Sequence, residues 1–185
     1  LSQNPSNEVL LIEAGAKDTK PEIHIPAGYA KLHKTKVDWG YYTVPQKNLL
    51  NRKLYLPRGK TWGGSSSTNA MAYVRGNAAD YDEWAMLGNP GWTYDEVLPY
   101  FKKSENNQDY LDHFHGQNGE LWVEHAKRFK TPFSEAFKLA CIANGFNSNQ
   151  DYNGKVQNGV GDFQFTIKNG SRNSAADAFL KPILG

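Results

Sequence analysis

The stretch from Gly59 to Gly76, GKTWGGSSSTNAMAYVRG, restricts the fold more than any other part of the sequence. It places four glycines and three consecutive serines in one short segment. Such small residues can form a flexible linker, a loop that cradles phosphate, or a backbone path pressed against a flat ligand. Trp62, Met71 and Tyr73 are interleaved with them, and flexible linkers are not built in that way.

The spacing of the glycines also excludes the common phosphate-binding loops. A Walker A loop needs a glycine five residues before Gly59, where the sequence has Leu54. The pair Gly159 and Gly161 does not complete a dinucleotide fingerprint, because Gln164 occupies the third glycine position. A close backbone approach to a large flat group remains, with hydrogen bonds expected from Ser65, Ser66 and Asn69.

The apolar run from Glu8 to Ile12, EVLLI, predicts a strand buried on both faces of a parallel sheet. A carboxylate at the end of such a strand, here Glu13, can accept hydrogen bonds from an adenosine ribose. The glycine-rich turn that usually accompanies it would precede Leu1. A helix-capping or surface acid is the other interpretation of Glu13.

Composition excludes several classes of protein. The 185 residues are 39% hydrophobic, which is enough for one domain with a core or for one domain and part of a second. The 21 basic and 19 acidic residues are dispersed, so no nucleic-acid partner is expected. The single cysteine, Cys141, excludes an internal disulfide and fits a reducing compartment. The apolar runs are too short for a transmembrane segment, which favours a cytoplasmic or peripherally membrane-associated protein.

The first half of the chain predicts loops over residues 16–56, punctuated by prolines such as Pro21 and Pro26. Short extended pieces are expected over 38–44 and 53–56. Two capped helices should follow, one over 78–87 after Asn77 and one over 94–105 after Thr93. We expect Val97, Tyr100 and Phe101 to form the apolar face of the second, and Pro99 to kink or break it.

The second half predicts a polar surface loop over 109–118, a strand over 120–124 and a helix over 131–144 that stops at Gly145. Phe133, Phe137, Ala140 and Cys141 share one face of that helix, and Cys141 is interpreted as an inert thiol in the helix core. A turn-rich segment over 147–161 precedes a strand over 163–167. A short helix over 174–180 is expected to stop at Pro182.

The segment from Gly59 to Asp82 resembles the first signature of the glucose-methanol-choline (GMC) oxidoreductases, flavoproteins that oxidise alcohols and sugars with FAD. The match is long, and one position departs from it, because Thr68 stands where the family usually carries an aliphatic residue. LLIEAG, DWGYYTVPQ, PGWTYDEVLPYFKKSE, FHGQNGELWV and NGSRNSAADAFLKP also resemble family segments in the same order. AYVRGNAADYDEW is most similar to the bacterial choline-dehydrogenase and alcohol-dehydrogenase branch.

The resemblance implies an α/β fold, mixed α and β within this chain: part of a Rossmann-like FAD-binding domain with the start of a substrate-binding domain. Residues 1–76 would contact FAD, with the signature loop over 59–82, and residues 77–185 would lead to the substrate domain. It further implies which residues contact FAD, and they fall into three groups. The adenosine contacts are Glu13 and Ala14; the pyrophosphate and flavin path is Arg58, Gly59, Gly63, Gly64 and Ser66; the isoalloxazine contacts are Asn69, Ala70, Met71 and Ala72.

Some members attach FAD covalently through a histidine at the position of Asn69, so we expect non-covalent FAD here. Arg58 or Lys60 could assist with phosphate charge. The partners implied are a small-molecule alcohol and an electron acceptor. The family's catalytic histidine lies in a C-terminal segment, beyond Gly185, so no catalytic residue is expected in this chain and the chain alone should be inactive.

Histidine motifs in the chain do not change this expectation. His113 and His115 could be a metal pair, but no third ligand has convincing spacing, so a polar loop and no metal site are expected. Two other functions stay open: a non-catalytic binding module derived from this fold, and a flavin-retaining lyase of the same family. Flavin absorbance would separate the first of these from the oxidoreductase, and turnover of an alcohol with a dye acceptor would separate the second.

Overall fold

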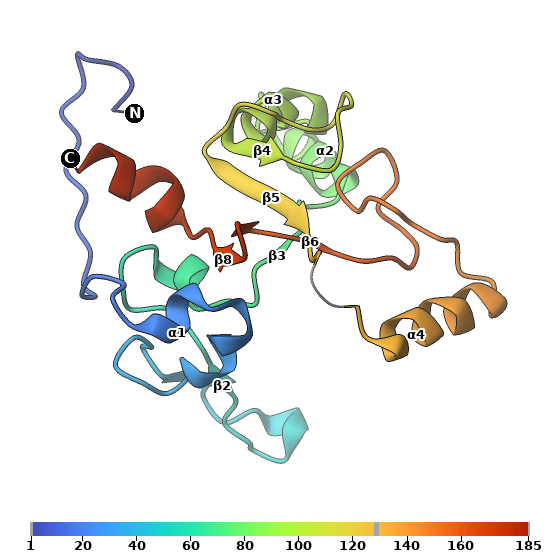
Figure 1. Cartoon of the computed structure of the whole chain (residues 1–185), viewed down its shortest axis with the longest axis horizontal. Helices are drawn as coiled ribbons and strands as arrows, with labels where there is room; N and C mark the ends of the chain where they lie inside the picture. The colour runs from blue at the N-terminus through green and yellow to red at the C-terminus, as the bar shows by residue number, and fades with distance from the viewer. Residues whose placement is uncertain (1, 128–129, 185) are drawn as a thin grey trace. The chain divides into compact units, whose positions relative to one another are not determined.

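The computed structural model describes residues 2–127 and 130–184, and it divides into two compact units, Leu1–Asn69 and Ala70–Gly185. Both units combine short helices with short strands, in agreement with the expected mixed α and β fold (Figure 1). The division falls within the glycine-rich signature, between Asn69 and Ala70.

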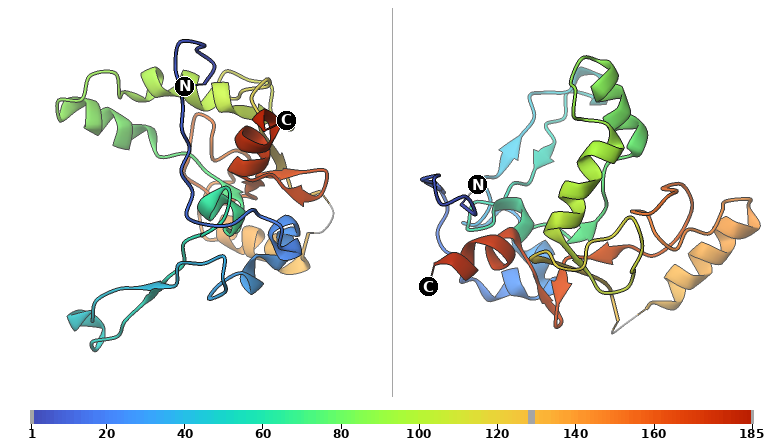
Figure 2. Two further views of the ribbon diagram at one scale, coloured as in Figure 1. Left: turned by 90° about the vertical axis from the view of Figure 1, so that its left-hand side faces the viewer. Right: turned by 90° about the horizontal axis from the view of Figure 1, so that it is seen from above.

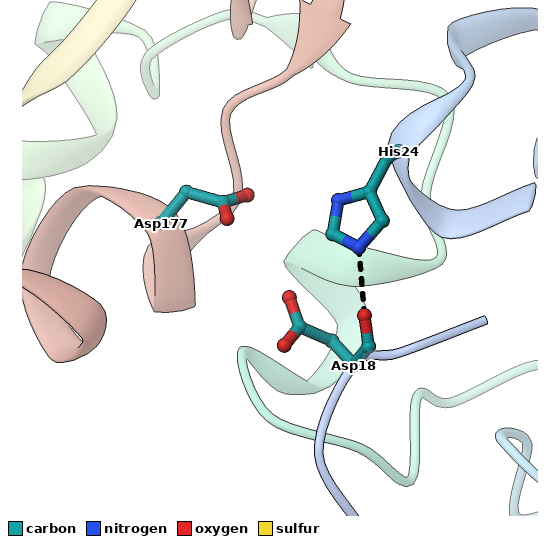
Figure 3. A group of neighbouring side chains, drawn as sticks. All are labelled: Asp18, His24 and Asp177. Atoms are coloured by element: carbon teal, nitrogen blue, oxygen red, sulfur yellow. Dashed lines mark hydrogen bonds between the residues drawn. The ribbon is translucent and has the colours of Figure 1, made fainter. Parts of the chain in front are cut away.

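The small core of the first unit is formed by two short helices, α1 (Pro21–His24) and η1 (Pro26–Lys31). Ile23 and Leu32 are completely buried there. The imidazole Nε2 of His24 donates to the backbone carbonyl of Asp18 over 2.7 Å, which fixes the entry to α1 (Figure 3). The prediction of loops was wrong here, because Pro21 and Pro26 begin these helices, where proline needs no N–H partner and its φ is already helical.

A hairpin follows, with strand β1 (Tyr41–Tyr42) antiparallel to strand β2 (Tyr55–Leu56). Both strands lie inside the predicted extended pieces, which are therefore confirmed. A single turn of helix, η2 (Lys47–Leu49), closes the hairpin tip. The left view of Figure 2 shows this hairpin extending away from α1.

The predicted strand over Glu8–Ile12 is not formed. The backbone there has no regular structure, and Leu10 and Ile12 are 84% and 83% exposed. A parallel strand acquires its hydrogen bonds and its two buried faces only from neighbouring strands and helices. No strand among residues 2–127 and 130–184 pairs with this run, so its apolar composition alone cannot produce a strand.

The second unit is organised around a four-stranded sheet with the order β3–β6–β5–β4. Its strands are β3 (Ala72–Tyr73), β4 (Glu105–Asn107), β5 (Leu121–His125) and β6 (Gln164–Phe165). Strand β4 is parallel to β5, and the other pairs are antiparallel. The predicted strand over 120–124 is confirmed as β5, which carries the completely buried Val123.

The predicted strand over 163–167 is divided in two. Its first part is β6, and its last residue begins β7 (Ile167–Lys168), which pairs with β8 (Ser171–Arg172) in a separate two-stranded ribbon. The next helical segment, η4 (Ala176–Leu180), continues directly into η5 (Lys181–Ile183). Pro182 therefore lies inside η5 and does not stop the helix where expected, because proline fits the first turn of a new helical segment.

Two capped helices, α2 (Ala78–Met86) and α3 (Tyr94–Ser104), lie side by side in this unit (Figure 1). Both caps are confirmed: the Asn77 side chain accepts from Ala79 N, and Thr93 forms a capping box with Glu96. Helix α3 is continuous through Pro99, so the expected break does not occur. Its buried residue is Leu98, whereas Tyr100 is 72% exposed.

Helix α4 (Pro132–Ala143) is also confirmed, with Thr131 as its N-cap and Gly145 beyond its end at a φ of 89°. Its apolar face is not part of a core: Phe133 and Phe137 are 84% and 65% exposed, and Cys141 is half-buried. Helical periodicity selects the residues that share a face but not the surface that covers them. Within the described ranges 2–127 and 130–184, none of the helices is both long and apolar enough to span a bilayer.

Candidate cofactor-binding site

The glycine-rich loop of the first unit contains three glycines, and two different structural requirements explain them. Gly63 and Gly64 have successive positive φ values of 83° and 54°, and they lead into η3 (Gly64–Ser67). A Cβ added to Gly64 would meet no atom within 4 Å, so the loop presents bare backbone to open space. A Cβ on Gly59 would lie 2.1 Å from the carbonyl oxygen of Gly64, so this glycine is required for packing of the loop on itself.

The serines of the loop are used mainly to hold its shape. Ser66 Oγ donates to the carbonyl of Gly63 over 2.6 Å, and Ser67 Oγ donates to that of Trp62 over 2.6 Å. Ser65 Oγ accepts from Gly59 N over 3.1 Å, a bond that does not use its own hydroxyl hydrogen. The predicted donor Ser66 therefore spends its hydrogen on the loop, and Ser65 is the better placed donor to a ligand.

The segment that carries Glu13 and Ala14 lies against this loop. Ala16 and Thr61 form a parallel bridge, and a Cβ on Gly15 would lie 2.2 Å from the carbonyl carbon of Lys60. Glu13 and Ala14 are exposed at the edge of this contact, with Glu13 Oε1 accepting from Gly15 N over 2.6 Å. The structure thus brings the two predicted adenosine residues close in space to the predicted pyrophosphate loop.

The Asp38 carboxylate accepts several hydrogen bonds, one of them from the start of the loop at Arg58. Its carboxylate accepts from the backbone N–H groups of Lys34, Gly40 and Arg58, over 2.7–3.1 Å, and from the Tyr55 hydroxyl. Burial opposes the charged form, but these hydrogen bonds outweigh it and lower the pKa of Asp38 to about 2.

The two predicted phosphate-binding side chains are both already engaged. The Lys60 ammonium lies 4.5 Å from the Trp39 ring centroid, and the exposed Arg58 donates to the Pro57 carbonyl. Both side chains would have to leave these contacts and change rotamer to bind a phosphate.

The predicted isoalloxazine strip crosses the division between the units, which falls between Asn69 and Ala70. In the first unit, Asn69 is exposed and its N–H donates to the carbonyl of Ser65 over 2.9 Å. In the second, Ala70 and Ala72 are exposed, whereas Met71 is only 4% exposed and has a positive φ of 64°. One residue of this short segment is therefore anchored in the core, while its neighbours leave backbone and small side chains accessible.

Sequence reasoning missed a buried charge network just beyond this strip. Glu105 is completely buried, and each of its carboxylate oxygens accepts two hydrogen bonds. Oε2 accepts from Arg75 Nη2 over 2.6 Å and from Gly116 N over 2.9 Å. Oε1 accepts from Asn107 Nδ2 over 2.9 Å and from His115 Nδ1 over 3.2 Å.

His115 corrects the expectation of a polar surface loop over 109–118. It is 3% exposed, and its Nε2 donates to Asp151 Oδ2 over 2.9 Å. Burial alone would lower the pKa of His115, but the hydrogen bonds to Asp151 and Glu105 raise it to about 9. The polar loop gives no sequence signal for this, because Asp151 lies 36 residues from His115 and Glu105 lies 10 residues away in another element, β4.

Ligand atoms of Asp112, His115 and Asp151 lie within 4.8 Å of one another, as they would around a metal ion. The nitrogens of His115 lie 2.9 Å from Asp151 Oδ2 and 3.2 Å from Glu105 Oε1, and Nδ1 also lies 2.9 Å from Asn107 Nδ2. The pKa of His115, raised to about 9, favours the doubly protonated ring, which has no lone pair for a metal. The geometry is that of an ion pair.

The raised pKa of His115 gives a pH prediction for the full-length protein. A group whose pKa is raised from 6.5 to about 9 on folding stabilises the fold fully below pH 6.5 and loses that contribution as the pH rises through 9. This rise in the pKa of His115 corresponds to a contribution on the order of 3 kcal/mol to the free energy of unfolding. We expect the denaturant concentration at the midpoint of unfolding to decrease as the pH rises from 6.5 to 9.5. The decrease should be smaller in His115→Gln, and an equal decrease in both proteins would contradict the assignment.

The loop geometry fits a large flat cofactor of the kind that the sequence implies. Gly64 faces open space and carries no side chain, so a flat ligand can approach its backbone closely. In the second unit, Ala70 and Ala72 are exposed and present only small side chains.

Comparison with known proteins agrees with this geometry. The GMC oxidoreductase family matches residues 8–185. Oxygen-dependent choline dehydrogenase from Brucella suis is 45% identical over all 185 residues, which correspond to 34% of its own length. The crystal structure of pyridoxine 4-oxidase from Mesorbium loti is 35% identical with a TM-score of 0.94, and the match covers 100% of this chain and 37% of that one.

An FAD-dependent oxidoreductase from Chaetomium thermophilum is 29% identical with a TM-score of 0.88, over 99% of this chain and 33% of that one. The chain thus spans about a third of the length of the relatives it matches. With a family match over nearly all of its residues, the chain belongs to the GMC oxidoreductase family.

Proposed function

We propose that this chain is the FAD-holding part of an oxidoreductase that acts on the CH–OH group of a small primary alcohol, choline or a similar compound. The observation that carries the proposal is the bare, positive-φ backbone at Gly63 and Gly64 in a chain of the GMC family. Relatives named as choline dehydrogenase and pyridoxine 4-oxidase support the class of substrate.

In this proposal the residues bind and orient the cofactor. Glu13 binds the adenosine ribose beside Ala14, and the loop with Arg58, Gly59, Gly63, Gly64 and Ser66 follows the pyrophosphate. The segment Asn69–Ala72 lies beside the isoalloxazine ring. N–H groups directed at the ring would stabilise negative charge that develops on it during reduction.

When bound, FAD supplies the two-electron acceptor: a hydride leaves the alcohol carbon, the hydroxyl proton passes to a base, and the product is an aldehyde. The residues described here hold the cofactor and do not supply that base. A second substrate, the electron acceptor, then removes the two electrons.

We also propose that FAD is bound non-covalently, because Asn69 has no imidazole with which to form a bond to the ring. Purified full-length protein should be yellow, and acid precipitation should release the flavin absorbance into the supernatant. A colourless protein would contradict FAD binding, and flavin that stays with the precipitate would contradict the non-covalent state.

Turnover tests the reaction itself. We expect the full-length holoprotein to reduce an artificial dye acceptor when choline is added, with betaine aldehyde formed in equal amounts. Flavin binding without any dye reduction by choline or other primary alcohols would favour a flavin-retaining lyase instead.

A further inference from the structure

Met71 has a backbone conformation that needs an explanation. It is a buried non-glycine residue with a φ of 64°, a strained conformation that persists only where the surrounding structure imposes it. On one side the surroundings are ordinary sheet bonds: Thr166 N donates to the Met71 carbonyl over 3.0 Å, and Ala72 and Tyr73 pair with β6.

Beyond those sheet bonds the backbone is held by side-chain amides, first of all that of Asn153. Strand β3 is at the edge of its sheet, yet the groups on either side of Val74 are both bonded. Asn153 Nδ2 donates to the Tyr73 carbonyl over 3.0 Å, and Asn153 Oδ1 accepts from Arg75 N over 2.8 Å. Asn153 is 3% exposed and so provides, with one amide, the two bonds that a neighbouring strand would provide.

A second amide extends this contact. Gln157 Nε2 donates to the Arg75 carbonyl over 2.9 Å, and Gln157 Oε1 accepts from Asn77 Nδ2 over 3.1 Å. Both amides come from the turn-rich segment 147–161. That segment therefore holds the backbone from Tyr73 to the N-cap of α2.

Asn153 is itself fixed by the buried charge network. Its N–H donates to Asp151 Oδ1 over 2.9 Å, Asp151 Oδ2 accepts from His115, and His115 donates to Glu105. Glu105 in turn accepts from the guanidinium of Arg75, whose own backbone N–H is bound by Asn153. The hydrogen bonds form a closed ring that starts and ends at Arg75.

We infer that Asn153 is a positioning residue for the flavin. Through this ring it holds the backbone of Tyr73–Arg75, and with it the strained Met71 and the neighbouring Ala70 and Ala72, in the conformation that we propose to line the flavin. This inference rests on the proposed function. It implies that the segment 147–161, some eighty residues further along the sequence, helps to set the reduction potential of the flavin.

Asn153→Ala in the full-length holoprotein tests it. Removing both bonds should weaken FAD binding to the apoprotein by about tenfold and shift the reduction potential of the bound flavin to more negative values, because misdirected donors stabilise the reduced ring less well. The value of kcat should fall more than KM changes. Asn153→Asp keeps the size of the side chain but places an oxygen against the Tyr73 carbonyl, so it should not restore the potential.

The matched control is Asn158→Ala, at an exposed position of the same loop, which should leave the affinity, the flavin spectrum and the potential unchanged. If Asn153→Ala does not fold, Gln157→Ala removes the bonds to the Arg75 carbonyl and to Asn77 but leaves both bonds of Asn153, so it should shift the potential in the same direction by less. Variants that lower the melting temperature while the flavin potential and spectrum stay as in the wild type would overturn the inference but not the proposed function. A wild-type protein without flavin would overturn both.

Discussion

Replacing Glu105 with glutamine is expected to lower the free energy of unfolding by about 3–5 kcal/mol, among the largest effects of any single substitution in this chain. The carboxylate is completely buried and accepts four hydrogen bonds, two of them from the cations Arg75 and His115. Glutamine has nearly the same shape, but its amide donates where donors already point at it, and it leaves two buried positive charges without their shared anion.

Denaturant unfolding of the full-length protein followed by tryptophan fluorescence measures this loss, with Glu120→Gln at an exposed position as the control. The pKa of His115 should fall toward its ordinary value in Glu105→Gln, because one of the two carboxylates that raise it has been removed. A change in stability below about 1 kcal/mol would mean that Glu105 is not ionised in the folded protein.

Replacing Gly59 with alanine is expected to destabilise the first unit by more than about 3 kcal/mol, whereas Gly64→Ala should cost only about 1–2 kcal/mol. The new methyl at position 59 would lie 2.1 Å from the Gly64 carbonyl oxygen, so the loop must open to admit it. At position 64 the methyl enters open space, and the cost is that of a left-handed conformation without glycine.

The two variants should also separate folding from cofactor binding. Gly64→Ala should fold and yet bind FAD more weakly, because its methyl occupies the space in which we propose that the cofactor passes. Thermal unfolding and titration of the apoprotein with FAD measure the two effects. Equal FAD affinity in Gly64→Ala and the wild type would contradict the placement of the cofactor at this loop.

Local elements followed from local rules. The caps at Asn77 and Thr93 lie where predicted, because a capping side chain bonds an N–H only two or three residues away. The family was also predicted correctly, because its signature is a run of consecutive residues, 59–82. The roles of the individual cofactor residues stay predictions, since they depend on a ligand.

Elements that depend on distant partners could not be predicted in this way. The run Glu8–Ile12 has the composition of a buried strand but is exposed, and α4 has an apolar face but keeps Phe133 in solvent. His115 was placed in a polar loop and lies in a charge network. In each case the deciding contact is made with residues that no periodicity or local spacing identifies.

The sequence by itself determined the family, the bare backbone of the signature loop and the capped starts of α2 and α3, because these are properties of consecutive residues. Only the tertiary structure decided that the Asn153 side chain substitutes for a neighbouring strand at the edge of β3. It also decided that Asn153 forms a closed ring of hydrogen bonds with Arg75, Glu105, His115 and Asp151. Those bonds join residues up to 80 positions apart. Their existence depends on the folding of the second unit as a whole, since a buried charge is tolerated only when every partner arrives together.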